Sequence, residues 1–152
     1  MTRSRRSDGD WKNSKGEEQQ LEFPIFSMSR IYDHIDLRVP DLAAAAPFFE
    51  TLLPVLGFVR KVTVEGWLQY EATDGEAAEF FGVTESAAHV ANENRIAFRA
   101  VSAAEVDRLA ATMVGAGAAN VEGPMDYEPG YYAVFFEDPW GNRFEICHRT
   151  AV

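Results

Sequence analysis

The segment DPWGNRFEI, residues 138–146, decides how the second half of this chain folds. Asp-Pro followed by Gly-Asn predicts a tight turn, because proline fixes φ and both glycine and asparagine tolerate positive φ. An aromatic run precedes the turn and an alternating segment follows it, so the stretch predicts a β-hairpin. The returning strand places Glu145 between Phe144 and Ile146. If these two neighbours face a core, Glu145 faces the other side of the sheet, as a ligand or a solvated residue.

The composition predicts an acidic globular protein of one domain, or of two small modules that share a core. The chain has 152 residues and a net charge of −10. Residues 1–28 hold five basic and five acidic side chains, so nine basic side chains face nineteen acidic ones in the remainder. This balance argues against nucleic acid or an anionic membrane as a partner.

Several further features lead us to expect a cytoplasmic protein. The single cysteine, Cys147, excludes an intrachain disulfide and suits a reducing compartment. No apolar run approaches the roughly 18 residues needed to span a bilayer. The basic start of the chain lacks the apolar region of a secretory signal.

Residues 1–28 predict a flexible tail in front of a single domain at 29–152. They are polar and mixed in charge, without a helical or strand period before the short apolar patch at 21–26. The alternative for that patch is that it docks on a partner.

Residues 30–83 predict a β-α-β-β-β module. Apolar and polar side chains alternate from Ile31 to Val39, broken only at Asp33, which is typical of a half-buried strand. Asp41 is placed to cap a helix with an apolar stripe that ends before Gly57, and the prolines within it predict a kink or an early end. Short strands are then expected at about 58–64, 67–72 and 77–83.

The same pattern restarts after a polar linker at 84–94, giving a second module at 95–149. A strand is expected around Ile96 and Phe98, and Ser102 with Glu105 forms a capping box for an amphipathic helix. Strands are expected at about 119–125, 131–137 and 143–148. The repeated order of elements predicts an internal duplication and an α+β fold.

Together these segments resemble the vicinal oxygen chelate superfamily, the glyoxalase, bleomycin-resistance and extradiol-dioxygenase group. The resemblance covers residues 30–149 and rests on four pieces: DHIDL at 33–37, the segment from Asp41 to Phe58, RIAF at 95–98, and DPWGN with the following Glu145. It implies two βαβββ modules whose mixed sheets curl into a cup. It implies less about activity, because one fold hosts many chemistries.

The resemblance also implies a ligand set for a divalent metal such as Zn, Ni, Mn or Fe. Family ligands come from the first and fourth strands of each module, which correspond here to His34, Glu79 and Glu145. The fourth position is Arg95 instead of the usual histidine, and a guanidinium has no lone pair for a metal. His89 in the linker is a further candidate, although a loop ligand is poorly preorganised.

Two functions follow from the resemblance and stay open. The first is a binding protein that holds a small, anionic molecule in the cup, without an intact family metal site. Its predicted ligand-binding residues are Arg38, Arg95, Arg99 and Tyr131, because clustered guanidiniums recognise carboxylates or phosphates bidentately. The second is a metal-dependent enzyme of lyase, isomerase or dioxygenase type. In either case the family implies a homodimer.

Three alternatives keep these residues structural. His34 can be a solvated or hydrogen-bonded histidine, and the arginines can pair with nearby carboxylates. We expect Arg95 to form an ion pair with Glu145, which would replace the metal electrostatically. Cys147 can be a small buried residue without reactivity.

Overall fold

The computed structural model describes residues 31–72 and 78–151. The predicted tail at 1–28, with its apolar patch at 21–26, lies outside the described residues. Residues 32–152 form one compact unit.

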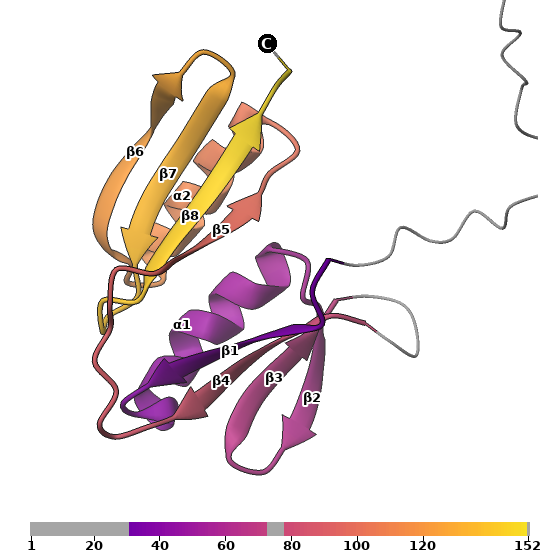
Figure 1. The fold of residues 1–152 in the computed structure, drawn as a ribbon, viewed down its shortest axis with the longest axis vertical. Coiled ribbons are helices and arrows are strands. Elements are labelled where there is room, and N and C mark those ends of the chain that lie inside the picture. The colour runs from indigo at the N-terminus through magenta and orange to yellow at the C-terminus, as the bar shows by residue number, and fades with distance from the viewer. Residues whose placement is uncertain (1–30, 73–77, 152) are drawn as a thin grey trace, which may run out of the picture. The chain divides into compact units, whose positions relative to one another are not determined.

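The first module contains one helix and a four-stranded mixed sheet (Figure 1). Its elements are β1 (His34–Val39), α1 (Leu42–Val55), β2 (Arg60–Val64), β3 (Trp67–Glu71) and β4 (Phe80–Glu85). The strand order is β1-β4-β3-β2, in which β1 and β4 are parallel and the other pairs are antiparallel.

The second module repeats this arrangement. Its elements are β5 (Arg95–Arg99), α2 (Ala103–Gly115), β6 (Ala119–Glu128), β7 (Tyr131–Glu137) and β8 (Arg143–Arg149). The strand order is β5-β8-β7-β6, again with a parallel pair between the first and last strands. Figure 1 shows α2 covering one face of this sheet. The predicted α+β fold of two βαβββ modules is therefore confirmed.

Both helices begin where their caps were predicted. The side chain of Asp41 accepts a hydrogen bond from the Ala44 amide at 2.9 Å, and Ser102 Oγ accepts from the Glu105 amide at 3.1 Å. Of the two effects predicted for the prolines, a kink or an early end, the early end is wrong, because α1 continues through Pro47 to Val55. Packing of its buried stripe outweighs the one backbone hydrogen bond that a proline removes.

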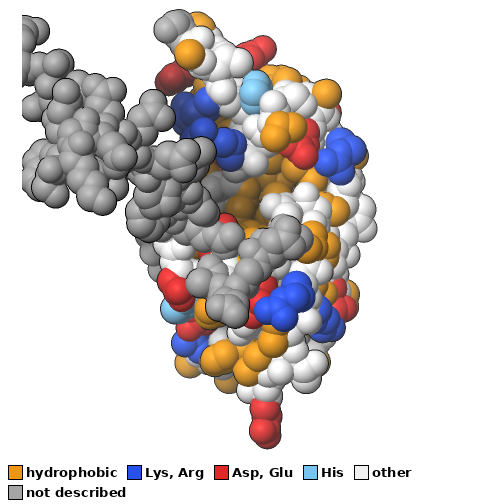
Figure 2. Space-filling model, turned by 90° about the vertical axis from the view of Figure 1, so that its right-hand side faces the viewer, with side chains coloured by type: hydrophobic (Ala, Val, Ile, Leu, Met, Phe, Trp, Pro, Cys, Tyr) orange, Lys and Arg blue, Asp and Glu red, His pale blue; other side chains and the backbone are white. Residues whose placement is uncertain are grey.

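Several strands differ in their bounds from the expected ones: β2 begins two residues later, at Arg60, and β3 and β8 each differ by one residue. β4 begins at Phe80 and extends through Glu85, two residues into the predicted linker, and β6 continues to Glu128. Among the helices that the structure describes, none is long and apolar enough to cross a membrane. Acidic, basic and hydrophobic side chains are intermixed on the side of the molecule in Figure 2.

A single hydrophobic core joins the two modules. Its buried side chains come from both helices and from the helix-facing side of both sheets. The ring of Phe98 on β5 lies 6.3 Å from Phe58, 6.2 Å from Phe81 and 6.4 Å from Phe144, measured between centroids. Because each sheet turns one face to this common core, the opposite face of each sheet is directed away from it.

The Asp138–Asn142 turn forms a second connection between the modules. Asn142 Nδ2 donates to Asp138 Oδ2 at 2.6 Å and to the carbonyl oxygen of Arg38 on β1 at 3.2 Å. Since both amide hydrogens are used, Asn142 Oδ1 accepts from Nε2 of His89 at 2.9 Å. The linker histidine is thus engaged by this turn. Burial raises the pKa of Asp138, and the hydrogen bonds from Asn142 and Trp140 oppose the rise.

Candidate functional site

Four arginines lie on the face of the β5-β8-β7-β6 sheet that is directed away from the core. Side chains alternate along each strand, and the parallel register places Arg95 beside Arg143 and Arg99 beside Cys147. We call this surface the module-two face. Its residues on β5, β8 and β7 are Arg95, Ala97, Arg99, Arg143, Glu145, Cys147, Arg149, Tyr131, Ala133, Phe135 and Glu137.

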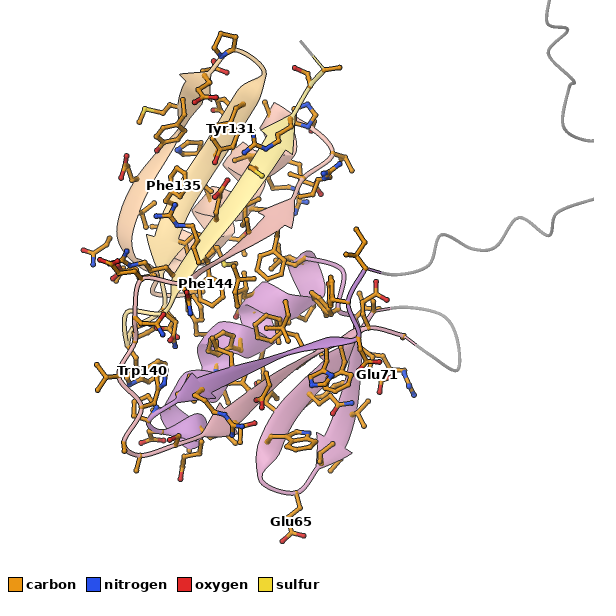
Figure 3. The ribbon with its side chains drawn as sticks, viewed as in Figure 1. Glu65, Glu71, Tyr131, Phe135, Trp140 and Phe144 are labelled. Carbon is orange, nitrogen blue, oxygen red and sulfur yellow. The ribbon has the colours of Figure 1, made fainter. Side chains whose placement is uncertain are left out.

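Aromatic rings hold two of these guanidiniums. Arg95 Cζ lies 4.4 Å from the centroid of Phe135, and Arg149 Cζ lies 3.8 Å from that of Tyr131. Tyr131 and Phe135 follow one another along β7 (Figure 3). The ring of Tyr127 from β6 contacts both, at 6.1 Å and 4.9 Å. Such cation–π contacts fix a guanidinium while leaving its N–H edge available to an anion.

Glu145 is buried at the centre of the module-two face, with 7% of its surface exposed. Its Oε1 accepts a hydrogen bond from the Tyr131 hydroxyl. Burial, together with this hydrogen bond and the charge of Glu145, raises the pKa of Tyr131 to about 12. The phenol therefore stays protonated at neutral pH and acts as a donor.

Cys147 lies beside Glu145 on the same face. Burial raises the pKa of its thiol and the charge of Glu145 adds to the rise, while Arg149 opposes it. A thiol in this environment stays protonated and is a poor nucleophile.

The expected ion pair between Arg95 and Glu145 is wrong, since none joins them in the ranges that the structure covers. The β5–β8 register places Ala97, not Arg95, beside Glu145. Arg95 instead stacks on Phe135.

The open face of the other sheet carries His34 and Arg38. The His34 ring stacks on Phe80 at 4.6 Å, and its Nδ1 lies 2.7 Å from Asp33 Oδ2. Arg38 pairs with Asp36 at 2.7 Å. Arg38 was expected to share a concave face with Arg95, but it lies on the other sheet.

A polar hollow of about 300 Å³ lies between β1 and the start of β8. Arg38 and Arg143 both line it, together with His89 and Asn142. The hollow therefore brings arginines of the two modules to one place, apart from the aromatic part of the module-two face.

The predicted metal ligands do not gather within one chain. Glu79 immediately precedes β4, and its Oε2 is buried. Glu145 belongs to the other sheet. Among the described residues, no three or more His, Cys, Asp or Glu side chains come together where they could hold a metal ion. The described part of a single chain therefore does not supply a fitting site for a divalent ion.

Sequence reasoning missed four contributors to the module-two face: Tyr127, Phe135, Arg143 and Arg149. The sequence of β8 did indicate two of them, because Arg143 and Arg149 are an even number of positions from Glu145 and so lie on the same face of the strand. Tyr127 carried no comparable signal, since β6 changes register at irregularities on either side of Met125.

Comparison with protein families identifies the class of this protein. Residues 31–146 match the model of the glyoxalase/bleomycin resistance protein/dioxygenase superfamily. The chain belongs to this superfamily, and the predicted resemblance is confirmed. No curated protein matches the chain.

Solved structures show the same fold. A glyoxalase/bleomycin resistance protein from Albidiferax ferrireducens is 26% identical, with a TM-score of 0.66, over 80% of this chain and 100% of that one. The fosfomycin resistance protein FosX from Listeria monocytogenes is 20% identical, with a TM-score of 0.63, over 81% and 96%. FosX from Mesorhizobium loti is 21% identical, with a TM-score of 0.59, over 78% and 92%. Because the two FosX proteins are only 20% and 21% identical to this chain, their similarity shows a shared fold alone.

Proposed function

We propose that this protein binds a small anionic organic molecule on the module-two face, within a cavity that a second copy of the chain completes. The observation that carries the proposal is the gathering of four guanidiniums on one sheet face of a protein whose net charge is −10. Guanidiniums bind carboxylate and phosphate groups bidentately, so such a face selects anions from solution.

The carboxylates on this face are already engaged. Glu145 accepts from Tyr131, and Glu137 accepts from Asn120 at 2.7 Å. Glu137 also lies 3.9 Å from Arg143, a long ion pair. In the described ranges, Arg95, Arg99 and Arg149 form no ion pair, which supports their availability to a ligand.

A second copy is part of the proposal because the open faces of one chain are both directed away from the common core. They cannot cover each other within that chain. Trp67 is 41% exposed on the open face of the first sheet, as an interface side chain would be in the free chain. Light scattering after size exclusion is expected to give about twice the chain mass of 17.0 kDa. A monomer at micromolar concentration would contradict the shared cavity.

Isothermal titration with small carboxylates and phosphonates tests the binding. Fosfomycin belongs among the probes, because two structural neighbours are named as fosfomycin resistance proteins. Arg95→Ala and Arg99→Ala are each expected to weaken binding by about tenfold or more, the usual scale for a charged hydrogen bond. Arg108→Ala is the matched control, since Arg108 lies on α2 and pairs with Glu105. If no anion binds, or if the control weakens binding equally, the proposal fails.

The second candidate is a metal-dependent enzyme, and the contact between His34 and Asp33 favours it. A carboxylate only accepts, so His34 Nδ1 donates and leaves the Nε2 lone pair for a metal. In a dimer, the remaining ligands would come from the partner subunit. Metal analysis of protein purified without chelators tests this, with thermal shifts in Ni, Zn, Mn and Fe(II). The metal-dependent enzyme is excluded if the purified protein contains no stoichiometric metal and if none of these metals shifts its melting temperature.

A further inference from the structure

The two cation–π pairs lie at opposite ends of one strand. Tyr131 and Phe135 are four residues apart on the same side of β7, and the Tyr127 ring lies 6.1 Å from the first and 4.9 Å from the second, so the two rings are at most about 11 Å apart. Arg149 lies over the first ring and Arg95 over the second. The module-two face therefore holds two guanidiniums at a separation set by the two rings of β7.

Each end also has a second arginine. The β5–β8 register places Arg143 beside Arg95. At the other end Arg99 lies beside Cys147, two residues before Arg149 on the adjacent strand. The positive charge on the face is thus divided into two pairs and is not spread evenly.

The surface between the two ends is apolar. Tyr127 contacts both rings and bridges them. Two small side chains flank the centre: Ala97 is exposed, and Ala133 is fully buried. Glu145 lies buried below and is held by the Tyr131 hydroxyl. A ligand crossing the middle of the face would therefore meet mainly apolar atoms.

We propose that the ligand is a linear molecule with an anionic group at each end and an apolar middle, lying along β7 between Arg95 and Arg149. This rests on the proposed function, the binding of an anion to the module-two face. A molecule with a single anionic group would use only one end, and would leave the other arginine pair solvated.

The separation of the two guanidiniums sets the length of the ligand. A carboxylate lies about 3 Å from the nitrogens that bind it, so carboxylates about 5 to 11 Å apart would reach both ends. Straight-chain dicarboxylic acids of about six to ten carbons span this range. Suberate is the central member, and its monomethyl ester keeps the length while removing one charge.

Isothermal titration of the full chain with succinate, suberate and suberate monomethyl ester tests the inference. Suberate is expected to bind about tenfold or more tightly than either of the other two, because only it reaches both arginine pairs. Arg149→Ala should reduce suberate affinity to that of the monoester, whereas Arg108→Ala should leave it unchanged. Circular dichroism confirms that each variant is folded.

The results separate this inference from the proposed function. If the monoester binds as tightly as suberate and Arg95→Ala weakens both, the face binds anions but the two-ended ligand is refuted. If suberate, succinate and the monoester all fail to bind while fosfomycin binds, the two-ended ligand is likewise refuted. If no probe binds, the proposed function itself fails.

Discussion

Replacing Asn142 with alanine is expected to destabilise the protein by about 3 kcal/mol. The side chain is 6% exposed and makes three hydrogen bonds, to Asp138 Oδ2, to the Arg38 carbonyl and to His89. Losing a bond to a carboxylate costs about 1.5–3 kcal/mol and each neutral bond about 0.5–1.5 kcal/mol. We take the lower part of the sum because the bond to Arg38 is long, at 3.2 Å, and water can replace the amide beside His89.

Urea unfolding at fixed protein concentration measures this loss, with Asn94→Ala as the control. Asn94 lines the same hollow but is exposed, so its replacement should change the free energy of unfolding by less than about 0.5 kcal/mol. Asp138 has a raised pKa in the folded protein, and the variant loses a hydrogen bond that opposes the rise. The loss should therefore shrink as the pH falls and Asp138 becomes protonated. Equal effects of the two variants, or a loss under about 1 kcal/mol that does not change with pH, would refute this account of the turn.

Three other expectations concern the module-two face and its neighbouring strands. The folded pKa of Tyr131 is about 12 against an ordinary value of 10, so its contribution to stability is complete below pH 10 and declines as the pH rises to 12. The Tyr131→Phe variant should therefore lose less stability between pH 8 and pH 11, as measured by urea unfolding. If the variant loses as much stability as the unchanged protein, the assignment is contradicted. A Cβ at Gly123 would lie 2.7 Å from the Ala133 carbonyl oxygen, whereas Gly66 has nearly the same φ (86° against 85°) and open space around it. Gly123→Ala should therefore lower Tm clearly more than Gly66→Ala. Equal shifts in Tm would show that the close approach at Gly123 is unimportant. Cys147 is 8% exposed and burial raises its pKa, so Ellman's reagent at pH 8 should modify the folded protein at least about tenfold more slowly than the urea-unfolded chain, and similar rates would mean that the thiol is accessible.

Local patterns predicted the elements of the fold because each depends on neighbouring residues. The Asp138–Asn142 turn, the alternation around Glu145 and the two helix caps involve contacts within about four positions in sequence. The duplicated order of elements then indicated how the strands are arranged, since it matches a known family.

The partners of individual side chains were harder to predict, because they depend on register between distant strands. β5 and β8 are parallel and no hairpin connects them, so no turn fixes which residue lies beside Arg95. The same holds for Arg38, whose sheet is separate from that of Arg95 although both residues follow the same alternating pattern. Which face each sheet turns outward depends on the packing of phenylalanines from both modules, which no local pattern contains.

The position of Phe98 has a consequence for how the chain acquires its structure. This one ring contacts Phe58 and Phe81 of the first half as well as Phe144 of the second. Each half expressed as a separate fragment would therefore expose the aromatic surface that the other half normally covers, and would lack part of its interior. Although the sequence repeats a motif, the repeats are not independent folding units. Because the two copies share their interior, we expect the intact chain to unfold in a single cooperative transition and not half by half.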